Sequence, residues 1–554
     1  MMIACNKDKM KILLIQPPVE DYYDTDIRLW PLGLAYIKAA LNLHHPDVDV
    51  VIRDYHAGHG RRMVGLPKPL HYLRDYYLPG DQSPFCTFTH YFRYGASAVM
   101  IAEDLKLHAP DVVGISCNFT PYFREAIEVA RIAKKVLGTQ VTVIMGGAHV
   151  SAVKLEMLRN SEVDFIVLGE AERPMVEWVE WALGRRMLQD VSSLGYREDG
   201  LLKMNIAREN IPIREMPIPS FTDLPIENYL LGRTPLAFML TSRGCPHQCS
   251  FCSVHTTFGS SYRRRTVDSI MEEIDLRYRQ GFRIIDFEDD NLTFFKDEMK
   301  VLLRRLITHF PNGEMEFVAM NGISYLSLDE ELLLLMKKAG FTQLNLSLVT
   351  SDESMRASTK RPHTLSHYRT VIETAFQLGL KVISYQILGL PGESLESILQ
   401  TLCFHTQYPV LLGASNFYLT PGAPVTDLFP TMTEDDYVRA RLSAMAITTT
   451  ISRDEIYSLF IITRLINFLK GLPILNDCTL SQLLAGDLHE QLASNKRTRL
   501  GLELLALLLM ENKLYFATSN GKRLNAKFKV DLFRQTWGKL GMIRTLNGAT
   551  IVLS

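Results

Sequence analysis

The sequence is poor in the features that mark several large classes of protein. Its 554 residues carry 60 Lys and Arg against 61 Asp and Glu, so it lacks the positive excess of a general nucleic-acid binder. Eight cysteines are too few for a disulfide scaffold and favour a reducing compartment. No apolar run reaches the roughly 18–20 residues of a membrane-spanning helix, and the N-terminus is too polar for a secretory signal. We therefore expect a cytoplasmic protein with no transmembrane segment and no nucleic-acid partner.

The composition and length favour a large multidomain α/β protein. Hydrophobic residues make up 47% of the chain and charged residues 22%, which allows a large core and excludes general disorder. We predict a Rossmann-like domain, a Pro-rich linker, a partial (β/α)6 barrel and a mainly helical C-terminal region. The predicted boundaries are 1–210, 211–235, 236–433 and 434–554.

The first predicted domain alternates short apolar runs with helical patterns. Such alternation is typical of a doubly wound parallel sheet, which binds its ligands outside the carboxyl ends of the strands. Residues 60–98 interrupt the alternation with many Tyr, Phe, His and Pro residues, and we expect them to form a lid or an interface. The predicted strands are 11–16, 48–52, 112–116, 141–145 and 165–168.

A second alternating series follows the Pro-rich segment. Six strand–helix units predict a barrel or a partial barrel. Beyond residue 434 the chain is mainly amphipathic and helical, with a short hairpin near 515–528, and we expect it to pack on the barrel. The predicted barrel strands are 237–241, 284–287, 316–320, 344–348, 382–388 and 416–419.

Three cysteines lie close together just after the first of these strands. Cys245, Cys249 and Cys252 occupy a turn-rich loop, whereas Cys5, Cys86, Cys117, Cys403 and Cys478 are scattered singly. Zinc usually takes four ligands in two close pairs, and His247 or His255 is available to complete such a site. Three closely spaced thiolates are better suited to an iron–sulfur cluster with one iron left open.

The cysteine spacing, with Phe251 just before the last cysteine, resembles the radical S-adenosylmethionine (radical SAM) motif. The resemblance implies that the three cysteines are the metal ligands of a [4Fe–4S] cluster and that Phe251 lies at the cofactor site. It also implies that Asp289 or Asp290, after the second barrel strand, contacts the methionyl group of S-adenosylmethionine. Because side chains alternate along a strand, we expect the two carboxylates to point in opposite directions, so that only one acts.

The same resemblance implies contacts of the later barrel strands with the adenosine part of S-adenosylmethionine. Residues 387–393 follow the fifth strand, where Ile387 and Gly389 are expected near the adenine. Relatives often carry a Glu at the end of the fourth strand for the ribose, but this chain has Ser347 there. The implied chemistry is reductive cleavage of S-adenosylmethionine to a 5′-deoxyadenosyl radical, with electrons from a donor such as flavodoxin or ferredoxin.

An α/β domain before such a barrel resembles the cobalamin-binding radical SAM family. The matching stretches are 31–36, 110–116, 145–149 and 167–172. The resemblance implies that cobalamin lies against the strand ends, beside Ser116, Gly146, Gly147, Gly169 and Glu170. Glycines there allow the backbone to approach a large planar ligand, although ordinary strand-to-helix turns also use glycine.

One departure concerns the axial ligand of cobalt. The methyltransferase-type motif is Asp-x-His-x-x-Gly, and Asp54 with His56 begins it. Position 59 is His, however, and Gly60 comes one residue late. We therefore expect cobalamin without a protein nitrogen on cobalt, and His56 near the corrin edge or at the surface.

Several functions are compatible with this pattern. The first is a cobalamin-dependent radical SAM enzyme that methylates, rearranges or cyclises a small-molecule substrate. The second is a radical SAM enzyme whose N-terminal domain binds substrate or a partner instead of cobalamin. The third is a non-catalytic iron–sulfur electron carrier, which would not need the S-adenosylmethionine contacts. A methylthiotransferase is disfavoured, because the N-terminal region lacks the three clustered cysteines of a second cluster.

Overall fold

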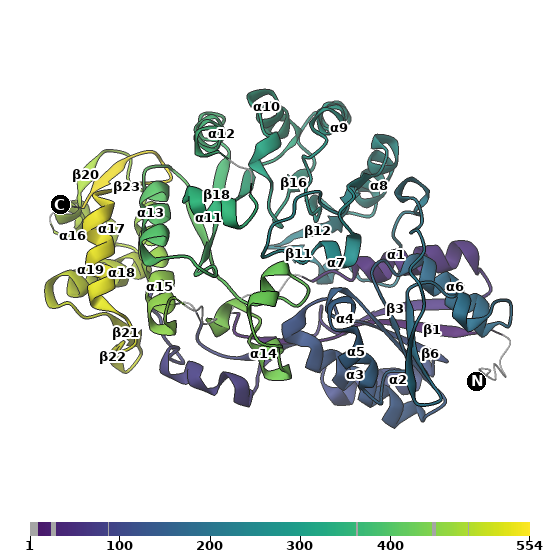
Figure 1. Cartoon of the computed structure of the whole chain (residues 1–554). Coiled ribbons are helices and arrows are strands. Elements are labelled where there is room, and N and C mark those ends of the chain that lie inside the picture. Colours follow the sequence, from purple (N-terminus) through teal and green to yellow (C-terminus); the bar gives the residue numbers. More distant parts are fainter. Residues whose placement is uncertain are drawn as a thin grey trace. The chain divides into compact units, whose positions relative to one another are not determined.

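The computed structural model describes residues 9–23, 29–86, 88–361, 364–445, 450–485 and 487–553. Cys5 lies outside these residues. The chain divides into two compact units (Figure 1). Unit 1 consists of Met1–Gly65, Tyr91–Asp290 and Thr420–Val438, and unit 2 of Leu66–His90, Asn291–Leu419 and Arg439–Ser554. The predicted domain boundaries remain predictions.

A seven-stranded sheet forms the centre of the N-terminal part of unit 1. Its strand order is β10-β9-β8-β7-β6-β1-β3, and the five strands from β8 to β3 run parallel. Their nearly continuous burial explains the apolar runs in the sequence. The predicted doubly wound sheet is confirmed. The strands are β1 (Lys11–Gln16), β3 (Asp49–Asp54), β6 (Val112–Ser116), β7 (Thr142–Gly146), β8 (Phe165–Val167), β9 (Leu194–Glu198) and β10 (Leu201–Met204).

Helices alternate with these parallel strands along the chain. In α3 the residues Ala126, Val129, Ala130 and Ala133 are buried, which is the spacing of one helix face. The winding direction changes between β1 and β6, and ligands of such sheets bind at this switch point. The helices are α1 (Leu32–His44), α2 (Ala98–His108), α3 (Phe123–Leu137), α4 (Ala148–Ala152), α5 (Lys154–Arg159) and α6 (Glu172–Ala182).

Unit 1 also contains the beginning of the barrel. Strands β12 (Thr234–Met239) and β15 (Ile284–Phe287) pair in parallel, and β11 (Leu230–Leu231) extends them on one side. The crossover holds α7 (His255–Phe258) and α8 (Val267–Arg279). A two-stranded ladder of β13 (Ser242–Arg243) and β14 (Arg263–Arg264) precedes α8 in the same connection.

The later barrel strands belong to unit 2. Strands β17 (Gln343–Val349), β18 (Lys381–Leu388) and β19 (Leu411–Asn416) form a parallel sheet, and β16 (Glu316–Val318) precedes them. The predicted sixth strand, 416–419, is wrong, because β19 ends where it was expected to begin. Gly413 hides this strand in the sequence: a Cβ there would lie 2.4 Å from the Tyr385 ring. The helices are α9 (Lys296–His309), α10 (Glu330–Ala339), α11 (Glu353–Ser358), α12 (Leu365–Gln377) and α13 (Leu395–Thr406).

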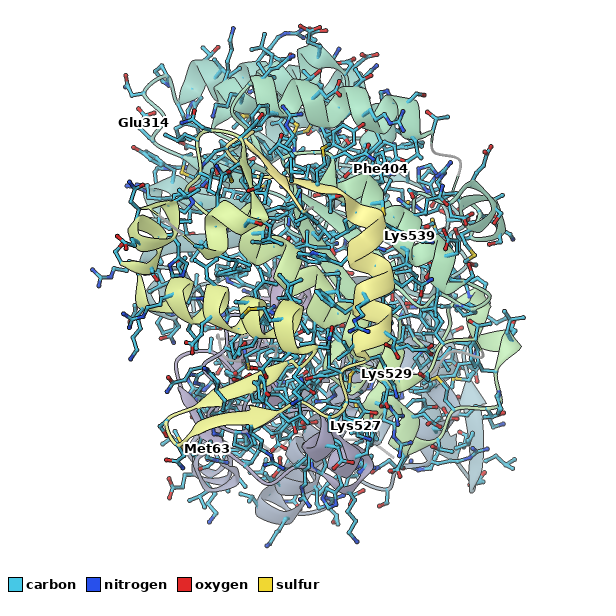
Figure 2. All side chains as sticks on the ribbon, turned by 90° about the vertical axis from the view of Figure 1, so that its left-hand side faces the viewer. Met63, Glu314, Phe404, Lys527, Lys529 and Lys539 are labelled. Atoms are coloured by element: carbon cyan, nitrogen blue, oxygen red, sulfur yellow. The ribbon has the colours of Figure 1, made fainter. Side chains whose placement is uncertain are left out.

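The C-terminal region is mainly helical, as predicted. A capping box of Ser452 and Glu455 begins α15 (Arg453–Lys470), whose Lys470 amine is fully buried. Figure 2 follows α19 (Val530–Leu540) from Lys529, just before the helix, to Lys539 near its end. The expected hairpin is confirmed as β21 (Tyr515–Thr518) and β22 (Gly521–Leu524). The other elements are α14 (Glu434–Arg439), α16 (Leu480–Leu484), α17 (Asp487–Ala493), α18 (Lys496–Glu511), β20 (Cys478–Thr479), β23 (Met542–Arg544) and β24 (Thr550–Val552).

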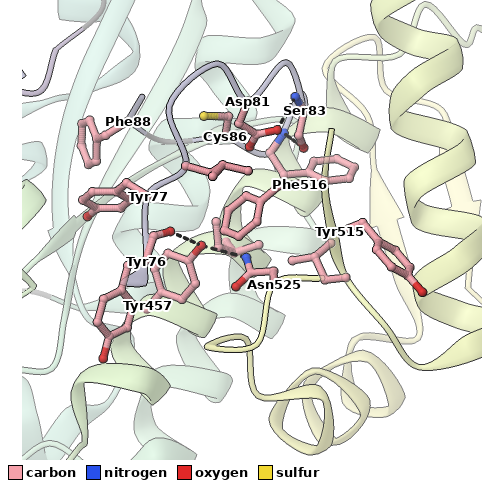
Figure 3. Close-up of a pocket in the computed structure, with 14 residues that line it drawn as sticks. Tyr76, Tyr77, Asp81, Ser83, Cys86, Phe88, Tyr457, Tyr515, Phe516 and Asn525 are labelled. Carbon is pink, nitrogen blue, oxygen red and sulfur yellow. Dashed lines mark hydrogen bonds between the residues drawn. The ribbon is translucent and has the colours of Figure 1, made fainter. Parts of the chain in front are cut away.

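The segment of residues 60–98, which interrupts the alternation of strands and helices, divides between the units. Its ends pair in unit 1 as β4 (Arg61–Met63) and β5 (Phe92–Tyr94), beside β2 (Val19–Asp21). The middle, residues 66–90, packs in unit 2, where the Tyr457 hydroxyl donates to the Tyr76 carbonyl and accepts from Asn525 (Figure 3). The cavity drawn there measures only about 10 Å³, room for one water molecule, so this contact is packing and not a ligand site.

Hydropathy along the helices gives no sign of a membrane span. Throughout the part of the chain that the structure describes, no helix is both long enough and apolar enough to cross a bilayer.

Candidate active site

The three clustered cysteines lie on a loop whose base is closed by backbone pairing. Strand β13 ends two residues before Cys245 and pairs with β14, so the loop leaves and returns at one place. Gly244 has φ +83°, and a Cβ there would lie 2.3 Å from the Ser261 carbonyl oxygen. Glycine is therefore required at the entry to the loop. Cys249 is buried, while Cys245, Cys252 and the intervening Phe251 are half-buried.

The electrostatics of these thiols fit a metal cluster. The pKa of the Cys252 thiol is raised to about 11, mainly by burial and also by the charges of Cys249, Asp290 and Cys245, against a lowering by the backbone of Val254. The three sulfurs thus lie within electrostatic reach of one another. The surroundings of Cys252 disfavour its thiolate, so a bound cation must supply that stabilisation.

The donor set fits an iron–sulfur cluster better than a single ion. Among the described residues, no group of three or more His, Cys, Asp or Glu is arranged to hold one metal ion. In a [4Fe–4S] cluster each thiolate binds a different iron, so the sulfurs stand farther apart than the ligands of one zinc ion. Three thiols on one closed loop suit that arrangement.

Both aspartates after β15 hold the base of the cysteine loop. The Asp289 carboxylate accepts from the Thr241 hydroxyl at 2.7 Å and backbone N–H at 3.1 Å, and also from the Ser242 hydroxyl. Asp290 accepts from the Gly244 N–H at 3.1 Å. The expectation that the two carboxylates point in opposite directions is wrong. Strand β15 ends at Phe287, so both residues lie on a turn where strand alternation no longer applies.

The two aspartates differ in what they leave available. Asp289 is almost completely buried, and both of its carboxylate oxygens accept hydrogen bonds from the base of the loop. Burial raises its pKa. The pKa of Asp290 is raised to about 6, first by burial and then by the charge of Asp289, with the Gly244 N–H acting in the opposite direction. Asp290 is therefore the better candidate for contact with a cationic group such as the methionyl ammonium.

A third set of side chains joins the cysteine loop to the seven-stranded sheet. Arg243 donates from Nη1 to Glu170 at 2.6 Å and from Nη2 to Glu172 at 2.6 Å. Arg263, opposite Arg243 in the β13–β14 ladder, also pairs with Glu170. The Arg243 guanidinium lies 4.8 Å from the ring centre of Tyr36. Sequence reasoning placed Glu170 beside cobalamin and missed its pairing with Arg243.

The other residues expected beside cobalamin gather at the carboxyl ends of β6, β7 and β8. Ser116 ends β6 and accepts from the Asn118 amide at 3.2 Å. Gly146 ends β7, and Gly147 has φ +123° with Asn118 and Cys117 so close that a side chain would clash. Gly169, with φ +68°, follows β8. The close packing of Gly147 is also what an ordinary tight turn requires, so these glycines fit both a cobalamin contact and a simple strand-to-helix turn.

The structure gives Asp54 a role other than orienting a histidine ligand. Its carboxylate accepts from the backbone N–H groups of His56 and Ala57 and from the Tyr229 hydroxyl at 2.7 Å. In a ligand motif the aspartate would bond to the imidazole. His56 is buried and lines a cavity of about 620 Å³ at the end of β3. The other lining residues are Leu29, Trp30, Ala57, Gly58, Gly60, Tyr94, residues 227–232 and Leu236.

In unit 2 the predicted adenosine contacts lie at the ends of β17 and β18. The Ser347 carbonyl accepts from Arg361 at 2.7 Å, and the strand register shifts between Ser347 and Val349. Val349 has φ +74°, a strained conformation for a β-branched residue. Sequence offers no signal for such a conformation, because valine normally avoids it.

The turn after β18 is shaped by a buried glutamate. Ile387 lies on β18, and Gly389 follows it with φ +80°. One oxygen of Glu393 accepts from the N–H groups of Gly389 and Leu390 at 2.9 and 3.1 Å. Burial raises the pKa of Glu393 to about 8, so this carboxyl is largely neutral at pH 7.

Comparison with known proteins agrees with this geometry. Residues 239–404 match the radical SAM superfamily model, and residues 91–179 match the B12 binding domain model. An uncharacterized methyltransferase of Pyrococcus horikoshii is 28% identical, covering 71% of this chain and 77% of its own. Cytidylyl-2-hydroxyethylphosphonate methyltransferase of Streptomyces wedmorensis is 27% identical, over 70% of this chain and 75% of its own.

A solved structure with a similar fold is that of the radical SAM methyltransferase TsrM from Kitasatospora setae. It was determined with cobalamin and a [4Fe–4S] cluster bound, and it superposes with a TM-score of 0.60 at 17% identity, covering 75% of this chain and 77% of its own. At that identity the likeness concerns the fold alone.

The domain match and the cysteine loop together identify a radical SAM enzyme. The electron-carrier interpretation is therefore excluded. Because the same chain carries a B12-binding domain, it belongs more narrowly to the cobalamin-binding-domain radical SAM family, as the sequence motifs predicted.

Proposed function

We propose that this enzyme cleaves S-adenosylmethionine reductively at a [4Fe–4S] cluster and uses cobalamin to transfer a methyl group to a small-molecule substrate. The observation that carries the proposal lies within unit 1. There the three-cysteine loop and the carboxyl end of β8 in the B12-binding domain are joined directly through Arg243, Glu170 and Glu172. The two cofactor-binding elements are thus built as one body.

When bound, the cluster and S-adenosylmethionine supply a radical by one-electron cleavage of the sulfonium, and cobalamin supplies a transferable methyl group. The protein's own part is to bind, orient and exclude water. We propose that Cys245, Cys249 and Cys252 bind three irons and that Asp290 holds the methionyl ammonium. In unit 2, Ser347, Ile387 and Gly389 remain the proposed contacts for the adenosine.

Electron supply and substrate belong to the same proposal. We propose a flavodoxin or ferredoxin as the electron donor, because reductive cleavage of S-adenosylmethionine needs one low-potential electron for the cluster. Methylation is preferred to ring formation or rearrangement, because both relatives named above are methyltransferases. The alternative is a radical SAM enzyme whose N-terminal domain binds substrate or a partner protein and no cobalamin.

The test is anaerobic purification followed by reconstitution with iron, sulfide and hydroxocobalamin. We expect about four iron atoms and one corrinoid per chain. With a reductant, we expect 5′-deoxyadenosine or S-adenosylhomocysteine to form from S-adenosylmethionine. Cluster formation and 5′-deoxyadenosine release without corrinoid binding would favour the cobalamin-free alternative. Absence of both S-adenosylmethionine products in cluster-loaded protein would contradict the proposal.

A further inference from the structure

The turn after β8 holds the cysteine loop from both of its sides. This turn is the connection between β8 and α6, up to the first helical residue Glu172. Before the first cysteine, Arg243 is bound by Glu170 and Glu172 of this turn. After the last cysteine, α7 packs against the same turn: a Cβ on Gly169 would lie 3.2 Å from the Thr257 carbonyl oxygen. A displacement of this turn must therefore displace the cysteine loop.

Arg243 with Glu170 and Glu172 forms an ion-pair bridge between the cysteine loop and the turn after β8, and this bridge is buried. Arg243, Glu170 and Glu172 are 4, 6 and 5% exposed. Glu170 is further fixed by Arg263 and by the Asn210 amide at 2.7 Å. Two carboxylates face two guanidinium groups, so the cluster of charges is balanced. Buried ion pairs add little net stability compared with apolar packing of the same volume, but they fix position sharply. These ion pairs therefore serve mainly to fix the position of the cysteine loop against the turn after β8.

The same turn also borders the ligand-binding edge of the sheet. Ligands of doubly wound sheets lie outside the carboxyl ends of the strands, and β8 is one of the parallel strands that end there. The backbone of the turn therefore adjoins the edge of the sheet where cobalamin is proposed to bind, while the carboxylates of Glu170 and Glu172 reach the cysteine loop. One rigid element is shared by two binding sites.

We propose that Arg243 is a positioning residue that couples the corrinoid site to the cluster loop through Glu170 and Glu172. This inference rests on the proposed function. Binding of either cofactor selects one position of the shared turn, and the second cofactor then meets the turn in that position and binds more tightly. Coupling of this kind is reciprocal, so S-adenosylmethionine and cobalamin must change each other's affinity by the same factor.

The experiment is a pair of titrations on cluster-loaded protein kept oxidised, so that S-adenosylmethionine is bound without being cleaved. Hydroxocobalamin affinity is measured by absorbance with and without saturating S-adenosylmethionine. In the unmodified protein we expect tightening of at least about fivefold. The affinity ratio is the hydroxocobalamin affinity with S-adenosylmethionine divided by the affinity without it. In Glu172→Gln and Arg243→Lys we expect this ratio to fall to about one, with cluster content and corrinoid binding retained.

A matched control is Glu180→Gln on the same helix α6. Glu180 is partly exposed near the other end of that helix from Glu172 and pairs with Arg186 at 2.6 Å, and its affinity ratio should equal that of the unmodified protein. If Arg243→Lys fails to fold or loses the cluster, Glu172→Gln and Glu170→Gln decide the matter, because each leaves Arg243 with one carboxylate.

The outcomes separate the coupling from the proposed function. An unmodified protein that binds both cofactors with a ratio of one overturns the coupling and leaves the proposed function intact. An affinity ratio that is unchanged in Glu172→Gln and Glu170→Gln would show that the coupling does not pass through the Arg243 bridge. An unmodified protein that binds the cluster and S-adenosylmethionine but no corrinoid overturns the proposed function itself, and the coupling with it.

Discussion

The radical SAM domain holds its two predicted cofactor-binding regions by different physical means. In unit 1 the cysteine loop is fixed by four carboxylates, those of Asp289, Asp290, Glu170 and Glu172. In unit 2 the turns after β17 and β18 are shaped by backbone conformation and by Glu393, whose raised pKa keeps it largely neutral. Carboxylates hold the region expected to bind a redox cluster, whereas backbone conformation and a largely neutral Glu393 shape the turns expected to meet the nucleoside.

The largest effect should follow from removing one cysteine of the loop. In Cys245→Ala, Cys249→Ala or Cys252→Ala we expect the iron–sulfur absorbance and the cleavage of S-adenosylmethionine to be lost, because each of the three thiolates is expected to bind a different iron of the cluster. Cys403→Ala is the control, since its thiol is in unit 2 and contacts the Lys539 carbonyl. Retention of both signals in any one of the three loop variants would remove that cysteine from the cluster.

The next effect concerns stability and compares a buried charge with an exposed one. Arg243→Met takes the cation from buried Glu172 and leaves Glu170 with Arg263 and Asn210, so we expect a loss of about 3–5 kcal/mol in the free energy of unfolding. Arg124→Met removes an exposed pair with Asp435 and should cost less than about 1 kcal/mol. Denaturant unfolding of the cluster-free proteins measures both. Equal losses would mean that the bridge is solvated like a surface pair.

The two aspartates provide a comparison within the loop base. Asp290→Asn should weaken S-adenosylmethionine binding by about 1.5–3 kcal/mol, the range for a hydrogen bond to a charged group. Asp289→Asn should instead disturb the loop, because its oxygens already accept from Thr241 and Ser242. Isothermal titration with cluster-loaded protein gives the affinity, and iron content reports on the loop. Unchanged affinity in both variants would leave the backbone around Gly389 as the better-supported contact.

A pH-dependent effect is expected from Glu393 in unit 2. Its folded pKa, about 8, lies above its ordinary value near 4.5. Folding therefore favours the protonated form, and this stabilisation is complete at low pH and is lost as the pH rises through about 8. We expect Glu393→Gln to lose less stability than the unmodified protein between pH 6 and pH 8.5. Parallel pH profiles of the two proteins would show that Glu393 is ionised throughout.

The smallest effect is expected at His56. The Asp54 carboxylate accepts from backbone N–H groups and from the Tyr229 hydroxyl, whereas in a cobalt-ligand motif the aspartate would bond to the imidazole. His56→Ala should leave the Co(II) electron paramagnetic resonance spectrum of the cobalamin-loaded protein unchanged. A nitrogen splitting that is present in the unmodified protein and disappears in the variant would identify His56 as a ligand.

Local patterns predicted the fold well where the residues are apolar and periodic. Strands β1, β6 and β15 were placed at their observed bounds, because buried strands leave continuous apolar runs. The strand at Leu411–Asn416 was misplaced, because Gly413, Ala414 and Ser415 lack that signal. The cysteine loop was found through spacing alone.

The contacts that build the site could not be read from the sequence. Arg243 and Glu170 are 73 positions apart, and nothing local links a guanidinium on one strand to a carboxylate after another. The direction of Asp289 and Asp290 depends on where β15 ends, a boundary that periodicity leaves open by a few residues. The left-handed conformation of Val349 arises from the surrounding packing and contradicts its local preference.

The path of residues 66–90 limits how this protein can be divided or recombined. The chain leaves unit 1 after Gly65, contributes this segment to unit 2, and returns at Tyr91. In unit 2 the segment buries Leu70, Leu73 and Phe85. A fragment cut after the N-terminal domain would carry these side chains without the surface that covers them, and the remaining fragment would lack part of its core. A cut at the predicted Pro-rich linker therefore separates residues 66–90 from the rest of unit 2, whose core this segment completes.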